Sequence, residues 1–196
     1  MRIYGDINSG NCLKVKFTAD HLGIPYEWID VDITKGESRT PEFLAMSPMG
    51  QVPVVAFGEG RFLAQSNAII RYLARNSALL PEDSFSQGKV DELLFWEQYS
   101  HEPYIATTRY HVVYLNRTLA QREGWRVERG EKALDLMERM IGDRNWFVGD
   151  AMSVADIALL AYTRLAHEGG FDLGSRPDVR RWISRCEDYL KLQPAS

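Results

Sequence analysis

Short apolar runs alternate with helical patterns over the first 76 residues of the chain. Four runs of this kind predict β-strands, because they are rich in β-branched and aromatic residues and are bounded by turn residues. They are RIYG at 2–5, YEWIDVDI at 26–33, VPVVAF at 52–57 and RFLA at 61–64. Gly58, Glu59 and Gly60 separate the last two runs and predict a hairpin turn.

Between the first two runs lies a helical stripe. Cys12, Val15, Ala19 and Leu22 recur at helical spacing, while Lys14, Lys16 and Asp20 fall off that stripe. The spacing predicts a helix that turns the Cys12 side chain towards the core. PEFLAM at 41–46 predicts a short helix with its proline in the first turn. Ser66 is predicted as the N-cap of the helix that follows it, NAIIRYLAR.

After NSALLPEDSFSQG the strand pattern stops and long helical patterns replace it, at about 87–118, 125–142, 153–167 and 177–190. Pro103 interrupts the first of them, because proline removes a backbone donor within a helix. In GDAMSVADIALLAY, Ser153 and Asp156 form a capping box, and Met152 packs on Ile157 as a hydrophobic staple.

This order of elements predicts two domains. Residues 1–76 form an α/β, thioredoxin-like N-terminal domain, with parallel strand pairing first and an antiparallel edge later. Residues 77–86 are a linker, and residues 87–196 form an all-α helical C-terminal domain. A chain of 196 residues is long enough to bury a core in each.

Composition and charge exclude several function classes. The formal net charge is −4 and no basic block stands out, so we expect no nucleic-acid partner. No apolar run approaches the roughly 18 residues that span a bilayer, and the N-terminus lacks a signal-peptide core, so a cytoplasmic protein is expected. The two cysteines and four scattered histidines make neither a disulfide framework nor a metal motif.

The turn DINSGNCLKVKF, residues 6–17, raises a chemical question with three answers. Ser9 can be an ordinary turn or cap residue. Ser9 or Cys12 can be a nucleophile, although no motif supplies the base that a serine nucleophile needs. In the third reading the turn binds the thiolate of a ligand. Lowering a thiol pKa by about two units takes ~2.7 kcal/mol. A helix N-terminus gives about 0.3–1 kcal/mol and a donating hydroxyl about 1.5–3 kcal/mol.

Two further stretches suit other parts of a ligand. In GQVPVV, a proline at the head of a strand fits if the Val52–Pro53 bond is cis, so that Val52 offers its backbone N–H and C=O to an extended peptide. An ordinary trans proline is the alternative. In AQSNAII, the helix start at Ser66 suits a carboxylate, and Gln65 can add an amide contact. A cysteinyl peptide with a free carboxylate satisfies all three stretches.

Four motifs in this order, SGNCLKV, MGQVPVV, AQSNAIIRYLA and GDAMSVADIALL, resemble those of the cytosolic glutathione S-transferases over essentially the whole chain. The resemblance implies glutathione as cosubstrate, a homodimer, a role in detoxification, a cis bond before Pro53 and binding of the γ-glutamyl carboxylate by Gln65 and Ser66. In serine-type relatives the residue matching Ser9 activates the glutathione sulfur, and in some bacterial-type relatives an asparagine matching Asn11 shares the task.

The resemblance also has limits. Tyr4 lies inside the first strand, so it does not match the catalytic tyrosine of other relatives. Lys35, Arg39 and Gln51 lie where some relatives contact the glycine end of glutathione. A pocket for a small hydrophobic electrophile is expected to be lined by the turn after the first strand and by the helix that Pro103 interrupts. The residues of that helix expected to line it are Tyr104, Ile105, Arg109 and Tyr110.

The reaction remains open at this level. The expected activity is attack of the glutathione thiolate on an electrophile. The alternatives are a glutathione-dependent isomerase, a disulfide reductase or a peroxidase, since the activating site is shared and the helical half chooses the second substrate. A relative that keeps the fold only as a binding or scaffold protein is the alternative outside catalysis.

Overall fold

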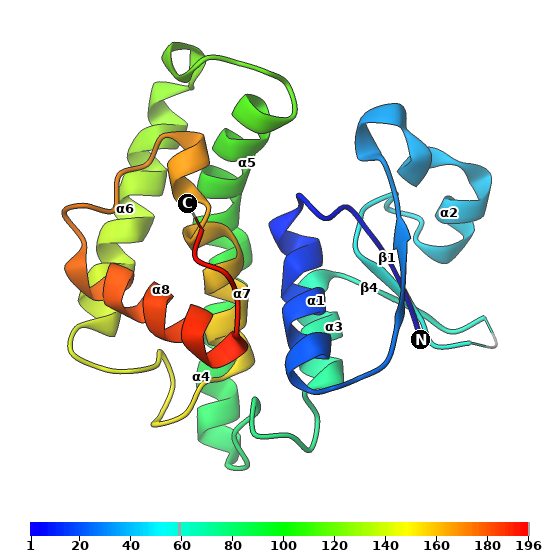
Figure 1. Ribbon diagram of the computed structural model, residues 1–196, viewed down its shortest axis with the longest axis horizontal. Helices are drawn as coiled ribbons and strands as arrows, with labels where there is room; N and C mark the ends of the chain where they lie inside the picture. The colour runs from blue at the N-terminus through cyan, green and yellow to red at the C-terminus, as the bar shows by residue number, and fades with distance from the viewer. Residues whose placement is uncertain (59, 196) are drawn as a thin grey trace. The chain divides into compact units, whose positions relative to one another are not determined.

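The computed structural model describes residues 1–58 and 60–195, and the chain divides into two compact units, Met1–Ser77 and Ala78–Ser196. Figure 1 shows the helices and strands of both units. Glu59 of the predicted hairpin turn lies outside the described residues. Among the described residues, no helix combines the length and the apolar character needed to cross a bilayer.

The first unit is a mixed sheet with helices, which confirms the predicted thioredoxin-like class. The strand order is β2-β1-β3-β4, with β1 parallel to β2 and antiparallel to β3, and β3 antiparallel to β4. The elements of this unit are β1 (Arg2–Gly5), α1 (Gly10–His21), β2 (Glu27–Asp30), η1 (Ile33–Lys35), η2 (Glu37–Arg39), α2 (Pro41–Met46), β3 (Val54–Ala56), β4 (Phe62–Ala64) and α3 (Ser66–Leu73).

Helices α1 and α3 pack side by side in the first unit (Figure 1). The predicted stripe of α1 is confirmed for Cys12, Val15 and Ala19, which are fully buried, whereas Leu22 is only partly buried and is the C-cap that follows the helix. Lys14, which was expected off the stripe, is also fully buried. The helix is therefore covered over more of its circumference than a single amphipathic stripe allows, and Phe17 and Thr18 share in this burial.

The start of α3 differs from the prediction. Ser66 was expected to cap the helix, but the helix begins at Ser66 itself, with Gln65 in the N-cap position and no side-chain cap. The Ser66 hydroxyl instead donates to Oδ1 of Asn11. The local sequence favoured a cap because serine is a common cap residue. The hydrogen-bond partner of Ser66 lies 55 residues away, so the local sequence does not predict it.

The second unit is helical, as predicted. Its elements are α4 (Ser84–Trp96), the π-helical turn η3 (Glu97–His101), α5 (Glu102–Val113), η4 (Leu119–Gln121), α6 (Gly124–Ile141), α7 (Val154–Thr163), η5 (Ala166–Gly169) and α8 (Pro177–Leu190). Helix α4 begins inside the predicted linker 77–86. Asp83 is its N-cap, and the Asp83 side chain accepts a hydrogen bond from the Ser86 N–H. The interruption expected at Pro103 takes the form of η3, one turn before that proline.

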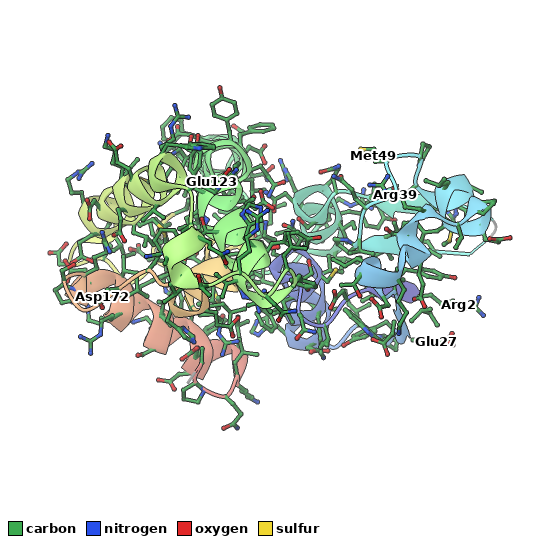
Figure 2. All side chains as sticks on the ribbon, turned by 90° about the horizontal axis from the view of Figure 1, so that it is seen from above. Arg2, Glu27, Arg39, Met49, Glu123 and Asp172 are labelled. Carbon is green, nitrogen blue, oxygen red and sulfur yellow. The ribbon has the colours of Figure 1, made fainter. Side chains whose placement is uncertain are left out.

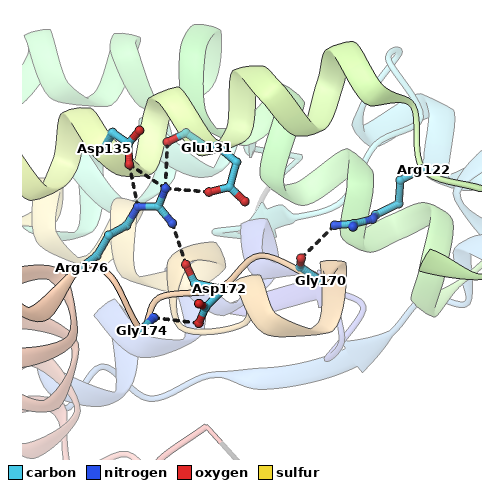
Figure 3. A network of polar contacts seen from close by, with 7 residues as sticks. All are labelled: Arg122, Glu131, Asp135, Gly170, Asp172, Gly174 and Arg176. Atoms are coloured by element: carbon cyan, nitrogen blue, oxygen red, sulfur yellow. Dashed lines mark hydrogen bonds and ion pairs between the residues drawn. The ribbon is translucent and has the colours of Figure 1, made fainter. Parts of the chain in front are cut away.

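Arg176 joins the segment before α8 to α6 (Figure 3). Its guanidinium is nearly buried and donates to Asp135, to Glu131 and to the carbonyl of Asp172, with N···O distances of 2.6 Å to each. Arg122 holds the same segment further back, through a 2.8 Å bond to the carbonyl of Gly170. A guanidinium has five N–H donors in a fixed fork, so the single side chain of Arg176 can bind all three acceptors.

The capping box of α7 is the buried polar centre of the second unit. Ser153 and Asp156 cap each other as predicted, and Met152 and Ile157 are both buried as the staple requires. Asp156 does more than close the box. Its Oδ1 accepts hydrogen bonds from the Phe147 N–H and from the indole of Trp182, each at 3.0 Å. Burial raises the pKa of this carboxyl, although the hydrogen bonds oppose that rise.

We expect Asp156→Ala to lower the free energy of unfolding by about 3 kcal/mol, because it leaves the buried donors of Phe147 and Trp182 without an acceptor. Urea unfolding measures the change. Glu128→Ala is the matched control, since its carboxylate makes only an exposed pair with Lys132 and such a pair contributes about 0.3 kcal/mol. A loss below about 1 kcal/mol for Asp156→Ala would contradict the assigned role.

Candidate active site

Strand register brings three separate turns to one edge of the sheet. Tyr4 of β1 pairs with Val54 of β3, which in turn pairs with Ala64 of β4. The carboxyl ends of β1 and β4 and the amino end of β3 therefore meet. The three turns are the one that leads into α1, the one that carries Val52 and Pro53, and the one that leads into α3.

Two helices begin at this edge, at Gly10 and at Ser66. Neither helix has an acidic residue in its first turn. The N–H groups at a helix start carry about half a positive charge, so each start favours an anion. Two anionic groups of one ligand, a thiolate and a carboxylate, can each be assigned to one of them.

Ser9 and Cys12 answer the question raised by the first turn. Cys12 is fully buried, its sulfur accepts a hydrogen bond from the Asp6 N–H at 3.4 Å, and the Ser9 hydroxyl bonds to the same sulfur. Burial raises the pKa of the Cys12 thiol to about 12, and the hydrogen bonds from Asp6 and Ser9 only partly oppose this rise. Cys12 is therefore a thiol at neutral pH and part of the core.

Ser9 sits in the N-cap position of α1 in an extended conformation, but its side chain does not cap the helix. It is partly exposed, whereas Cys12 is buried. Its hydroxyl is one of the groups that lower the pKa of the Cys12 thiol against the effect of burial.

Asn11 and Ser66 are brought together, since Ser66 Oγ lies 3.1 Å from Asn11 Oδ1. Gln65 lies next to them with φ at 69° and ψ at 110°, outside the regions that residues other than glycine usually occupy. Non-glycine residues held in such a conformation concentrate at functional sites. The Gln65 amide also contacts the sulfur of Met49, with Nε2 and Sδ 3.3 Å apart.

The Val52–Pro53 bond is cis, as the resemblance implied. Pro53 is buried and Val52 packs against the core cluster of Val31, Phe43 and Val54. The bond directly precedes β3, so the Val52 backbone lies at the same edge as the two helix starts. Binding of a peptide by Val52 stays a prediction.

Arg39 reaches the same region. Its Nη1 donates to the carbonyl of Met49 at 3.0 Å, and Figure 2 labels both residues. Gly50 makes this possible. Its φ is 61°, and a Cβ at this position would lie 2.5 Å from Arg39 Nη1 and 2.9 Å from the Ser38 carbonyl. Met49 links Arg39 to Gln65, and in the sequence it carries no signal of this role except its place before that glycine.

Lys35 and Gln51 are the least defined of the predicted contacts. Lys35 is exposed and pairs with Asp32 at 2.9 Å. Hydrogen bonds from Thr34 and Lys35 hold the pKa of the Asp32 carboxyl well below its usual range. Gln51 is exposed directly before Val52. Their contact with the glycine end of a ligand stays a prediction.

The four helix residues predicted for the electrophile pocket do not share one face of α5. Ile105 and Arg109 lie four residues apart on the buried face, and Arg109 donates to Glu168 at 2.6 Å. Tyr104 meets Trp125 edge-on and accepts a bond from Arg129. Six residues at 3.6 per turn place Tyr104 and Tyr110 about 120° apart around the helix.

This arrangement gives Arg109 a structural role, because its ion pair holds η5 against α5. Tyr110 is half-exposed and stacks on Tyr114 with ring centroids 5.0 Å apart. Contact of Tyr104, Arg109 or Tyr110 with a second substrate stays a prediction. Within the described part of the chain, no group of three or more histidine, cysteine or acidic residues is arranged to hold a metal ion.

Comparison with known proteins agrees with this geometry. The family model "Glutathione S-transferase, N-terminal domain" matches residues 8–76, and "Glutathione S-transferase, C-terminal domain" matches residues 126–188. A crystal structure of a glutathione S-transferase from Pseudomonas fluorescens Pf-5 is 43% identical with a TM-score of 0.94, and the alignment covers 99% of this chain and 98% of that one. The chain therefore belongs to the glutathione S-transferase family.

Curated relatives are more distant. Glutathione S-transferase GstB of Escherichia coli K12 is 29% identical over 95% of this chain and 92% of its own length. A maleylacetoacetate isomerase of Pseudomonas aeruginosa is also 29% identical, over 92% of this chain and 88% of its own length. Two reaction types thus occur among proteins that are similar to almost the whole chain.

We expect neither cysteine to react with an aromatic disulfide reagent in the native protein at pH 8. Cys12 and Cys186 are both buried, and burial raises the pKa of both thiols, so little reactive thiolate is present. Both thiols should react once the protein is denatured. Absorbance of the released thiol measures this. Fast native reaction that Cys12→Ala abolishes would make Cys12 a nucleophile.

Proposed function

We propose that this protein is a glutathione S-transferase that activates the thiolate of bound glutathione for attack on a small hydrophobic electrophile. The observation that carries the proposal is the meeting of two helix starts without acidic first turns beside the cis Val52–Pro53 bond. Family membership supports glutathione as the cosubstrate. No metal is needed for this chemistry.

Each part of glutathione has a proposed partner. The cysteinyl sulfur faces the start of α1, where Ser9 and Asn11 act as catalytic donors. The cysteinyl backbone pairs with Val52 ahead of Pro53. The γ-glutamyl carboxylate faces Gln65 and Ser66, and the glycine carboxylate faces Lys35, Arg39 and Gln51.

The chemistry follows from the change in charge at sulfur. A thiol with a pKa near 8.5 is mostly protonated at pH 7, and the thiolate is the nucleophile. Hydrogen-bond donors and the α1 dipole favour the charged form and lower that pKa. The thiolate then forms the new carbon–sulfur bond, and the electrophile accepts the electron pair. Tyr104, Arg109 and Tyr110 are proposed to contact this second substrate.

An isomerase reaction is the second candidate, favoured by the similarity to a maleylacetoacetate isomerase. Both reactions begin with the same thiolate, so the first site alone does not separate them. Screening electrophiles, disulfides, peroxides and a cis-dicarbonyl alkene with glutathione distinguishes conjugation, reduction and isomerisation by their products.

Glutathione should raise the melting temperature of the protein. A ligand that binds only the native state adds about 2.7 kcal/mol of stability at one hundred times its dissociation constant. Thermal melts at rising millimolar glutathione measure the effect, with the tripeptide Gly-Ala-Gly as the control. A melting temperature that does not change at any concentration would favour a scaffold protein that has the fold without the ligand.

Replacing the donors should raise the pKa of the bound glutathione thiol. Losing a donor to a charged sulfur costs about 1.5–3 kcal/mol, or roughly one to two pKa units. Ser9→Ala and Asn11→Ala should each raise the pKa of the bound thiol. Ultraviolet absorbance of the thiolate against pH measures both. An unchanged pKa in Ser9→Ala together with a rise in Asn11→Ala would make the amide the donor and leave Ser9 a turn residue.

Assembly into a homodimer is proposed from family membership alone. Sedimentation equilibrium should then give a mass near twice the 22.4 kDa of the monomer at micromolar concentration. A monomer mass over the whole micromolar range would contradict this proposal, while the assignment of the glutathione site would stand.

A further inference from the structure

Met49 is the methionine whose side chain is most open to solvent, with 48% of its surface exposed. The remaining methionines are buried or half-buried, and they are Met1, Met46, Met137, Met140 and Met152. Oxidation of a thioether to a sulfoxide follows its exposure. An oxidant in solution therefore reaches the sulfur of Met49 before that of the others.

Both ends of Met49 contact residues to which the proposed function assigns parts of glutathione. Its backbone carbonyl accepts a hydrogen bond from Arg39 Nη1 at 3.0 Å, and its Sδ accepts one from Gln65 Nε2 at 3.3 Å. The turn is closely packed behind it, because a Cβ on Gly50 would lie 2.9 Å from the Ser38 carbonyl. A chemical change at this sulfur thus acts directly on Gln65.

The present contact between the sulfur and Gln65 is a weak one. A thioether is a weak hydrogen-bond acceptor, so the Gln65 amide can exchange it for a carboxylate at little cost. The carboxylate is the stronger acceptor, because a hydrogen bond to a charged group contributes about twice as much as a neutral one. In its reduced state, Met49 therefore leaves Gln65 available to the γ-glutamyl end of glutathione.

Oxidation would reverse this preference. The sulfoxide is a polar group, and its oxygen is a much stronger acceptor than the thioether sulfur. Sδ already lies in contact with Nε2 of Gln65, so an oxygen added on that side lies within hydrogen-bond reach of the amide. The Gln65 backbone, with φ at 69°, is held in an uncommon conformation, and the side chain has to respond in its place.

We propose that Met49 is an oxidative modification site: a hydroperoxide converts its thioether to the sulfoxide, and the modified side chain weakens glutathione binding by engaging the amide of Gln65. The sulfur lone pair attacks the terminal peroxide oxygen, a sulfur–oxygen bond forms and the oxygen–oxygen bond breaks. The proton on the transferred oxygen goes to the leaving oxygen, which departs as water or an alcohol. Sulfur loses two electrons and the peroxide gains them.

This inference rests on the proposed function, since Gln65 is assigned there to the γ-glutamyl carboxylate. The two cysteines do not compete for the oxidant, because Cys12 and Cys186 are buried and the thiolate is the form that reacts. Methionine sulfoxide is reduced by dedicated reductases, so the modification is reversible.

Controlled oxidation tests the proposal. The wild type is treated with hydrogen peroxide, the excess is removed with catalase, and fragment masses locate each added oxygen atom. Met49 should gain its oxygen before Met46 and Met140. Calorimetry should then show that the dissociation constant of glutathione rises about tenfold, as expected when one hydrogen bond to a charged group is lost. Treatment with methionine sulfoxide reductase should restore the original value.

Three variants separate Met49 from other effects of peroxide. For each, the readout is the ratio of dissociation constants after and before oxidation, so that any effect of the substitution itself cancels. Met49→Leu keeps a side chain of similar volume and should give a ratio near one. Met46→Leu is the matched control and should behave as the wild type does. Met49→Gln places a strong acceptor beside Gln65 and should weaken binding without peroxide.

Several results would overturn the proposal. They are oxidation of Met46 or Met140 ahead of Met49, an unchanged dissociation constant once Met49 is fully oxidised, and an equal loss of affinity in Met49→Leu. Thermal melts show whether each variant is folded, and Met49→Gln serves if Met49→Leu is not. Glutathione binding by the untreated wild type tests the proposed function separately. Its absence would remove that function and this proposal together, whereas binding that withstands oxidation removes only the proposal.

Discussion

The hydrogen-bonded register of β1, β3 and β4 is the constraint on which the candidate active site depends. Tyr4, Val54 and Ala64 lie side by side across the sheet. The turns that follow or precede them are therefore held at one edge, although they are far apart in the chain. A shift of one residue in any strand would turn its side chains to the opposite face of the sheet and would displace the turn at its end.

Polar groups inside each unit depend on partners from distant elements. Asp156 joins α7 to α8 through Trp182, and Arg176 joins the segment before α8 to α6. Ser66 and Asn11 do the same at the start of α3 and α1. An unpaired buried polar group costs more than its hydrogen bond returns, so such groups favour one arrangement of the elements over its competitors.

Local patterns predicted the elements and the capping box, because each depends on residues within one or two turns. The order of strands and helices, the burial of Cys12 and the Ser153–Asp156 pair follow from such patterns. The role of Ser66 and the burial of Lys14 could not be predicted in this way. They depend on neighbours that come from elsewhere in the chain, and the ion pair of Arg109 with Glu168 spans 59 residues. The sequence carries no local signal for these partners.

The π-helical turn η3 sets the phase of the helix that follows it. A π-helical turn holds an additional residue, and one residue corresponds to about 100° of rotation around an α-helix. Helix α5 therefore presents a face that an uninterrupted continuation of α4 would direct elsewhere, and this face carries Ile105 and Arg109. Chain length between Glu97 and His101 is thus as important as residue identity. A variant of the family with one residue fewer there would present a different set of α5 side chains to the same surroundings.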